Sequence, residues 1–377
     1  MFELLNERVK ISKIREIRID DLLGRSVVSF EDHLPSIRKH YENRRILITG
    51  AGGSIGSELC RRLAMMKPKD LLLLDKDENG IFEIENELKS RYRQIKATPL
   101  ISDIRNRDLL NVVFEKFRPE VAFHAAAHKH VPLMEHNVSE AIKNNIIGTR
   151  NLARLADQYA LQSFIYISTD KAVNPSSVMG ATKKIGEIII QEIAQQSQTH
   201  FSCVRFGNVL GSRGSVVPLF QKQISQGGPI TITHPDVKRY FMSISEAVQL
   251  IIQAGTIGHK GEIFVLDMGE PIRILDLAKD LIKLSGFSEE DFEIKITGLR
   301  PGEKLFEEIL IDEEKDRVTQ FQKIYIAPPI QIDGSKFAAS LNNLLAAADA
   351  LNEDEIRCCL KAFGIGYNSE GNAKNPA

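Results

Sequence analysis

Short apolar runs recur along the first half of the chain, and longer stretches with helical spacing separate them. Each run lacks the polar alternation of a half-exposed strand, which indicates strands buried on both faces of a sheet. In order, the runs lie at residues 46–48, 71–74, 100–101, 121–123, 164–167 and 201–204. The helix predicted most clearly spans 178–194, where Ile185, Ile188, Ile189 and Ile193 form an apolar stripe. This alternation predicts an α/β fold with a doubly wound parallel sheet.

The first apolar run ends in a glycine-rich turn. Gly50, Gly53 and Gly56 follow it with the spacing G-x-x-G-x-x-G, and a helical stretch comes next. Glycine lets the backbone turn tightly and approach a phosphate, while a helix N-terminus offers unpaired N–H groups and a partial positive charge. The strand, turn and helix together predict a Rossmann-type site for the pyrophosphate of a dinucleotide, with Ser54 and Ile55 as further contacts.

The ends of the next strands fit the same ligand. Asp75 ends the second run about 20 residues after the turn, where an acid accepts hydrogen bonds from an adenosine ribose, and this favours NAD over NADP. A helix N-cap or a solvated loop acid is the alternative for Asp75, and Lys76 leaves room for a 2′-phosphate. Two residues at the adenine edge and two small residues against the dinucleotide complete the predicted cofactor site: Asp103, Ile104, Ala125 and Ala126.

The run at 164–167 leads into Thr169, Asp170 and Lys171, which therefore emerge beside the nicotinamide half of the cofactor. Lys183 lies on the first turns of the following helix. There its ammonium would bond the nicotinamide ribose and favour the ionised form of nearby acids. Alternatively, Asp170 caps the turn, while Lys171 and Lys183 are solvated surface lysines.

Composition excludes several classes of protein. A chain of 377 residues with 43% hydrophobic residues can bury a large core. Its 49 Lys and Arg balance 50 Asp and Glu without a basic block, so no nucleic-acid partner is predicted. The four cysteines lack C-x-x-C spacing, and the histidines at 124, 128 and 130 lack a supporting acid or cysteine pattern, so no metal site is predicted. No run approaches the roughly 20 apolar residues of a membrane span and no secretion signal is evident, so a cytoplasmic chain without a membrane segment is expected.

Six segments, taken in order, carry the motifs of a known family: 50–56, 124–135, 144–149, 168–172, 204–212 and 300–304. They resemble the extended short-chain dehydrogenases/reductases. Within these, the chain is most similar to the UDP-N-acetylglucosamine 4,6-dehydratases of the polysaccharide biosynthesis protein family. The resemblance covers about residues 45–310.

The resemblance implies an internal redox cycle with resident NAD. The sugar is oxidised at C4, loses water across C5 and C6, and is reduced at C6. By resemblance, Thr169 would bond the C4 oxygen, Asp170 would protonate the leaving C6 hydroxyl, and Lys171 would take the C5 proton. Lys171 would then need a lowered pKa, which we expect from burial and from neighbouring Lys183.

Met179 occupies the position of the usual dehydrogenase tyrosine, and a thioether cannot take up the C4 hydroxyl proton. The configuration-retaining subgroup of these dehydratases has methionine here, so the resemblance implies that subgroup. Asp170 and a water near Lys183 are both candidates for the C4 hydroxyl proton. Two other functions stay open: a UDP-sugar 4-epimerase, and a dinucleotide-binding sensor without catalysis.

The substrate site is expected downstream. Arginine suits phosphate oxygens, so Arg213, Arg239 and Arg300 are candidates for the UDP diphosphate, with a surface ion pair as the alternative for each. Four further residues complete the predicted substrate contacts: Lys129, Asn208, Val217 and Glu303.

Four regions are predicted along the chain. A lead-in segment (1–44) precedes an NAD-binding Rossmann domain (45–204, with later segments returning to it). A smaller C-terminal UDP-sugar-binding lobe (205–310) follows, and then an appendage with a disordered tail (311–377). By resemblance, the protein forms a homo-oligomer.

Overall fold

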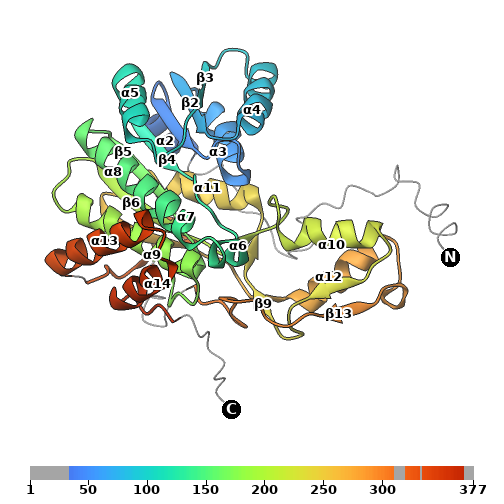
Figure 1. Cartoon of the computed structure of the whole chain (residues 1–377). Coiled ribbons are helices and arrows are strands. Elements are labelled where there is room, and N and C mark those ends of the chain that lie inside the picture. The colour runs from blue at the N-terminus through green and yellow to red at the C-terminus, as the bar shows by residue number, and fades with distance from the viewer. Residues whose placement is uncertain (1–33, 310–318, 332, 369–377) are drawn as a thin grey trace.

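The computed structural model describes residues 34–309, 319–331 and 333–368. Figure 1 shows a large domain from which a smaller lobe projects. Most of the predicted lead-in segment and the predicted disordered tail lie outside the described residues. The lead-in ends in helix α2 (Leu34–Tyr41), whose Tyr41 hydroxyl donates a hydrogen bond to the carbonyl of Ile252 at 2.8 Å.

One eight-stranded sheet forms the centre of the large domain, with the order β14-β11-β6-β5-β4-β1-β2-β3. The strands are β1 (Arg45–Thr49), β2 (Asp70–Asp75), β3 (Ala97–Ile101), β4 (Val121–His124), β5 (Ser163–Ile167), β6 (His200–Arg205), β11 (Lys260–Leu266) and β14 (Ile324–Ala327). All neighbours pair in parallel except β14, which is antiparallel to β11. The strand order reverses between β1 and β4, and this is where a doubly wound sheet binds ligands. The predicted fold class is confirmed.

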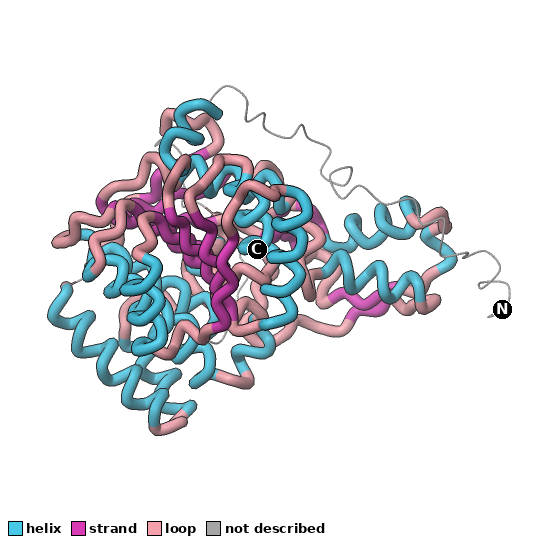
Figure 2. Tube along the Cα trace, turned by 90° about the horizontal axis from the view of Figure 1, so that it is seen from above, coloured by secondary structure: helices cyan, strands magenta, loops and turns pink. Residues whose placement is uncertain are grey.

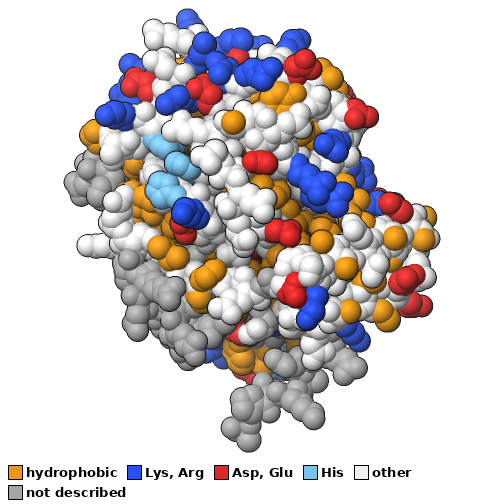
Figure 3. Space-filling view, turned by 90° about the vertical axis from the view of Figure 1, so that its left-hand side faces the viewer, with side chains coloured by type: hydrophobic (Ala, Val, Ile, Leu, Met, Phe, Trp, Pro, Cys, Tyr) orange, Lys and Arg blue, Asp and Glu red, His pale blue; other side chains and the backbone are white. Residues whose placement is uncertain are grey.

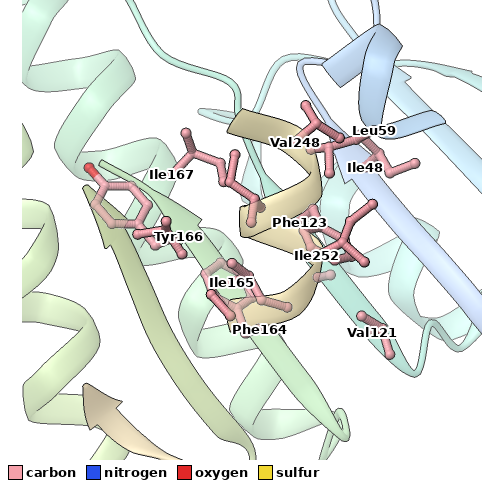
Figure 4. Packing of buried hydrophobic residues seen from close by; sticks show 14 of the residues in the cluster. Ile48, Leu59, Val121, Phe123, Phe164, Ile165, Tyr166, Ile167, Val248 and Ile252 are labelled. Atoms are coloured by element: carbon pink, nitrogen blue, oxygen red, sulfur yellow. The ribbon is translucent and has the colours of Figure 1, made fainter. Parts of the chain in front are cut away.

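Helices cover the sheet, as Figure 2 shows from above. They are α3 (Ser54–Ala64), α4 (Glu78–Arg91), α5 (Arg107–Phe117), α6 (Val131–Glu135), α7 (Val138–Ile142), η4 (Lys143–Ile147), α8 (Gly148–Gln158), α9 (Val178–Ala194) and α11 (Ile244–Ala254). Helix α9 matches the predicted helix and begins at Ser177, whose hydroxyl accepts a hydrogen bond from Gly180 N. On α11, Val248 and Ile252 pack with Ile48 and Phe123 of the sheet (Figure 4), so this later segment belongs to the large domain.

The smaller lobe has its own apolar core, which includes Phe220, Ile230, Leu281 and Phe292. Its elements are α10 (Val216–Ser225), β8 (Ile230–Ile232), β9 (Lys238–Arg239), β12 (Ile272–Arg273), α12 (Ile274–Leu284), η6 (Glu289–Asp291) and β13 (Ile294–Ile296). The short pair β7 (Asn208–Val209) and β10 (Phe241–Met242) lies between the lobe and the sheet.

The appendage folds back on the large domain. Helices α13 (Gly334–Asp349) and α14 (Glu353–Ala362) pack on α7 and α9 around a second core that contains Phe337 and Leu344. None of the described helices is both long and apolar enough to cross a membrane. On the face shown in Figure 3, basic and acidic side chains are interspersed, in keeping with the balanced charge of the chain.

Candidate active site

The glycine-rich turn joins β1 to α3 and has the geometry that a pyrophosphate requires. Gly50 has a φ of +72°, and a Cβ there would lie 2.7 Å from Ala126 N. A Cβ on Gly56 would collide with the carbonyl oxygen of Gly50. Helix α3 begins after Gly53 without a side-chain cap, so its first N–H groups are free to bind an anion. The turn therefore fits the phosphates of a dinucleotide.

A pocket beside this turn, which we call the Asp75 pocket, brings together most of the predicted adenosine contacts. It is lined by Gly50, Gly53, Asp75, Lys76, Asp103, Ile104, Ala125 and Ala126, among others. The Asp75 carboxylate accepts hydrogen bonds from Gly52 N at 3.0 Å and Asp77 N at 3.1 Å, so it also braces the turn. The N-cap of α4 is Asp77, so the N-cap alternative for Asp75 is wrong. A bond from Arg105 lowers the pKa of Asp103 and keeps that carboxyl ionised.

A second cavity, the strand-end cavity, lies along the carboxyl ends of the parallel strands. Predicted cofactor and catalytic residues line it together: Gly50, Gly53, Ser54, Ile55, Gly56, Ala125, Thr169, Lys171, Met179 and Lys183. A third cavity, the lobe cavity, lies against the smaller lobe and is lined by Lys129, Lys171, Asn208, Arg239, Arg300, Glu303 and Glu307, among others. Lys129, Lys171 and Asn208 line both cavities, so the two meet at Lys171.

Thr169, Asp170 and Lys171 form one hydrogen-bonded cluster at the end of β5, where the short helix η5 (Asp170–Ala172) begins. Oδ1 of the buried Asp170 accepts bonds from the Thr169 hydroxyl at 2.7 Å and from Lys171 Nζ at 2.9 Å. Its Oδ2 is buried and has no hydrogen-bond partner within residues 34–309, 319–331 and 333–368. Lys171 Nζ also donates to Asn208 Oδ1 at 3.2 Å and lies 3.6 Å from Glu307 Oε1. The alternative that Lys171 points to solvent is wrong.

The expected lowering of the Lys171 pKa is also wrong. Burial lowers this pKa, but the carboxylates of Asp170 and Glu307 outweigh burial, and the pKa of Lys171 lies above its ordinary value. Lys171 is therefore a charged proton donor in the resting site. Sequence reasoning missed Glu307, although it follows the 300–304 motif closely.

Lys183 is the lysine whose pKa is lowered, to about 7, by burial that Glu187 only partly offsets. Its Nζ donates to the carbonyl of Ile167 at 2.6 Å and lies 4.0 Å from the ring centroid of Tyr166. Glu187, one turn further along α9, is bound to Arg205 at 2.6 Å. The alternative that Lys183 is a solvated surface lysine is therefore wrong.

Of the three arginines proposed for the diphosphate, two line the lobe cavity, but in different surroundings. Arg300 is exposed and lines the lobe cavity, as predicted. Arg239 also lines it, but its buried guanidinium is bound to Glu303 and to the carbonyls of Lys238, Lys304 and Leu305.

Two predicted substrate residues lie away from the lobe cavity. Arg213 lines the strand-end cavity, where its backbone N donates to Ser54 Oγ at 3.0 Å and its side chain pairs with Glu83 at 2.9 Å. Val217 is buried in the core of the lobe, and Val216 lines the cavity in its place. Val217 lies in the first turn of helix α10, which directs its side chain into the core of the lobe.

His124 lies buried between the hydroxyls of Thr49 at 2.8 Å and Thr149 at 2.9 Å. Asn145 holds the backbone of His128 through both of its amide atoms. In the part of the chain that the structure describes, no group of three or more potential ligands is placed to hold a metal.

Residues 46–329 match the model of a family described as polysaccharide biosynthesis protein. The chain belongs to this family. It is 50% identical to the capsular polysaccharide biosynthesis protein CapD of Staphylococcus aureus over 325 residues. This match covers 86% of this chain and 54% of CapD. The chain spans about half the length of the curated relatives that it matches at this level.

A further relative supports the resemblance to nucleotide-sugar dehydratases. The chain is 32% identical to a UDP-N-acetylglucosamine 4,6-dehydratase (inverting) of Campylobacter jejuni, over 88% of this chain and 94% of that protein. Among solved structures, Pen from Bacillus thuringiensis is 34% identical, with a TM-score of 0.71, and the match covers 76% of this chain and 90% of Pen. Nucleotide-sugar epimerases and dehydratases whose structures hold NAD share the fold at 17% to 20% identity. The predicted family is thus confirmed.

Proposed function

We propose that this chain is an NAD-dependent nucleotide-sugar 4,6-dehydratase. Its substrate is UDP-N-acetylglucosamine and its product is UDP-2-acetamido-2,6-dideoxy-4-hexulose, the first step towards a bacterial deoxyamino sugar for a glycan or polysaccharide. The observation that carries the proposal is the cluster of Thr169, Asp170 and Lys171 where the strand-end and lobe cavities meet. A hexose at this point has one cavity on the side of the dinucleotide turn and the other on the side of the lobe.

Residues of the large domain fit NAD along its length. The glycine turn and the free N–H groups of α3 would hold the pyrophosphate, and Asp75 would accept bonds from the adenosine ribose. Lys183 lies where the nicotinamide ribose would bind. Bound NAD supplies a hydride acceptor and donor, so the overall reaction needs no outside oxidant or reductant.

The charges in the site support one assignment of the two proton transfers of the elimination. Because Lys171 is held as an ammonium, it protonates the leaving C6 hydroxyl. The buried carboxylate of Asp170 lines neither cavity, so it takes the C5 proton through the Thr169 hydroxyl, which it bonds at 2.7 Å. This reverses the assignment that the resemblance implied. The sugar loses a proton from C5 and hydroxide from C6, which leaves as water with the proton from Lys171. C5 takes a proton back from Asp170 when C6 is reduced, and the proton released from the C4 hydroxyl replaces the one that Lys171 gave up.

Thr169 lines the strand-end cavity, and its hydroxyl, which donates to Asp170, can still accept a hydrogen bond from the C4 hydroxyl. For the C4 hydroxyl proton, the pKa of about 7 favours a water beside Lys183 over Asp170, because the neutral amine can accept a proton. Met179 lines the same cavity, and its thioether takes no part in proton transfer. Retention of configuration at C5 rests on the resemblance at Met179 alone, whereas the related Campylobacter jejuni dehydratase is named as inverting.

A proton-NMR time course with UDP-N-acetylglucosamine in deuterated water tests the proposal. A dehydratase gives a new C6 methyl, deuterium at C5 and a hydrated 4-ketone, and the ring couplings report the C5 configuration. An isobaric product would instead show an epimerase. Retained NAD without turnover would show a sensor.

A further inference from the structure

A second carboxylate lies beside Lys171, from a segment far along the chain. Glu307 Oε1 lies 3.6 Å from Lys171 Nζ and 3.8 Å from Arg239 Nε. The Glu307 side chain is only 5% exposed. Lys171 is thus held from two sides, by Asp170 at the end of β5 and by Glu307 from the segment that follows the 300–304 motif.

The position of Glu307 is fixed by the backbone around it. Lys238 N donates to the carbonyl of Leu305 at 3.1 Å, and Arg239 donates to the carbonyls of Leu305 and Lys304 at 3.2 and 2.7 Å. These bonds tie the residues just before Glu307 to strand β9. The approach of Glu307 to Lys171 is therefore a built feature of the fold.

One oxygen of Glu307 has no hydrogen-bond partner among the residues that the structure describes. Its Oε2 is buried without a hydrogen bond, although the residue lines the lobe cavity. Glu303 lines the same cavity, but its Oε1 accepts bonds from Thr233 and Arg239 and its Oε2 accepts one from Arg300 N. Among the described residues, Asp170 holds the other buried carboxylate oxygen without a partner, and Asp170 does not line the cavity.

A buried carboxylate oxygen without a donor is costly, and native proteins rarely leave one in that state. Glu307 lines a cavity of the substrate site, so a small rotation of its carboxyl group would bring the buried Oε2 to a donor on a bound ligand. UDP brings diphosphate oxygens that repel a carboxylate, whereas an acetamido hexose brings hydroxyl and amide N–H donors. The sugar therefore suits Glu307 and the diphosphate does not.

We propose that Glu307 is a specificity-determining residue that contacts the sugar of the bound nucleotide sugar. Its Oε2 accepts a hydrogen bond from a hydroxyl or amide N–H group of the hexose, while its Oε1 positions Lys171. A site built to bond a polar substrate group discriminates strongly against a ligand that lacks it. This inference rests on the proposed function and deepens it.

Calorimetric titration of the NAD-loaded protein with UDP and with UDP-N-acetylglucosamine tests the proposal in Glu307→Gln and Glu308→Gln. In Glu307→Gln, the amide oxygen turns to Lys171 and the NH₂ group faces the cavity, so the acceptor is lost. We expect UDP-N-acetylglucosamine to bind about 10- to 100-fold more weakly and UDP to bind within about twofold of the wild type. Glu308 is the matched control, because its side chain is 43% exposed, bonds Asn174 and Lys304, and does not itself line the cavity. Glu308→Gln should leave both affinities unchanged.

Equal weakening of both ligands in Glu307→Gln would overturn the proposal, because Glu307 would then only hold the lobe. Unchanged affinity for UDP-N-acetylglucosamine would overturn it too. If Glu307→Gln does not fold, Glu307→Asp takes its place, because its carboxylate is one methylene further from the cavity. If Glu307→Asp keeps its affinity for UDP, the lobe is intact.

Turnover by the wild type, measured in parallel, separates this inference from the proposed function. If Glu307→Gln loses affinity only for UDP-N-acetylglucosamine but the wild type dehydrates nothing, the role of Glu307 is upheld and the dehydratase is rejected. If the wild type dehydrates the sugar but Glu307→Gln loses affinity for both ligands equally, the dehydratase is upheld and the role of Glu307 is rejected. If the wild type binds UDP-N-acetylglucosamine no more tightly than UDP, the role of Glu307 is overturned.

Discussion

Lys171 and Lys183 line the same cavity, yet their surroundings give them opposite charge preferences. Lys171 faces oxygen acceptors on Asp170, Asn208 and Glu307. Burial lowers its pKa, but the carboxylates raise it above the ordinary value. Lys183 donates to the carbonyl of Ile167 and lies against the ring of Tyr166, and burial, which Glu187 only partly offsets, lowers its pKa to about 7.

The difference shows that nearby carboxylates, more than depth of burial, set the charge of a lysine in this site. One end of the cavity holds a proton donor and the other holds a group that can accept a proton near neutral pH. A reaction that both removes and delivers protons can use the two ends separately.

Asp170→Asn should have the largest effect, because it removes the base for C5 and the nearer of the two carboxylates on Lys171. We expect turnover to fall about 10²- to 10⁴-fold while bound NAD is retained. Without this carboxylate the surroundings of Lys171 become more like those of Lys183, so the pKa of Lys171 should also fall. Turnover by NMR and NAD released on denaturation are the measurements, with the exposed Asp108→Asn as control. Full activity would remove Asp170 from the site.

Lys171→Met tests the acid role and should lower turnover about 10²- to 10³-fold. A substrate whose C6 hydroxyl is replaced by fluoride separates the two assignments, because fluoride leaves without being protonated. Lys171→Met should regain most of its activity with this analogue, and Asp170→Asn should not. Rescue of Asp170→Asn alone would instead restore the assignment in which Asp170 is the acid and Lys171 the base.

Lys183→Met tests the other end of the comparison through stability. The pKa of Lys183 is about 7 in the folded chain and close to 10.5 in the unfolded chain, so the unfolded chain binds more protons between these values. The contribution of Lys183 therefore makes the folded state more stable as the pH rises through this window, by about 3 kcal/mol between pH ~7 and ~9. Urea unfolding at several pH values should show this rise in the wild type relative to Lys183→Met. Parallel curves for the two proteins would mean that Lys183 is not desolvated.

The sequence predicted the parts of the site that are contiguous in the chain. The glycine turn and the step from β5 into Thr169, Asp170 and Lys171 each depend on one strand and the turn after it, so local patterns suffice. The pKa of Lys171 is raised first by Asp170, its neighbour in the chain, and then by Glu307, which reaches it only through the folding of the lobe. The sequence shows that Asp170 is adjacent but not that the two side chains pair, and no local pattern encodes the contact with Glu307.

The appendage braces the helix that carries Met179 and Lys183. Arg357 on α14 donates to the Glu135 carboxylate at 2.8 Å and to the Glu135 carbonyl at 2.7 Å. The other carboxylate oxygen of Glu135 accepts a hydrogen bond from Val178 N, at the start of α9, at 2.7 Å. Arg357 therefore supports the helix that carries Lys183, and Glu307 supports Lys171. Both residues lie far along the chain from the group that they position.

Arg357→Ala should have the smallest effect, because the Glu135 contact to Val178 survives it. We expect the free energy of unfolding to fall by about 1–2 kcal/mol and turnover to fall a few-fold, with UDP affinity unchanged. Lys361→Ala is the matched control, since it removes one exposed positive charge from the same helix. If the two variants lose equal stability by urea unfolding, the contact with Glu135 is no more than a surface ion pair. If Arg357→Ala loses stability but keeps full turnover, the appendage stabilises the fold without positioning α9, and the two ends of the cavity differ in how they are supported as well as in charge.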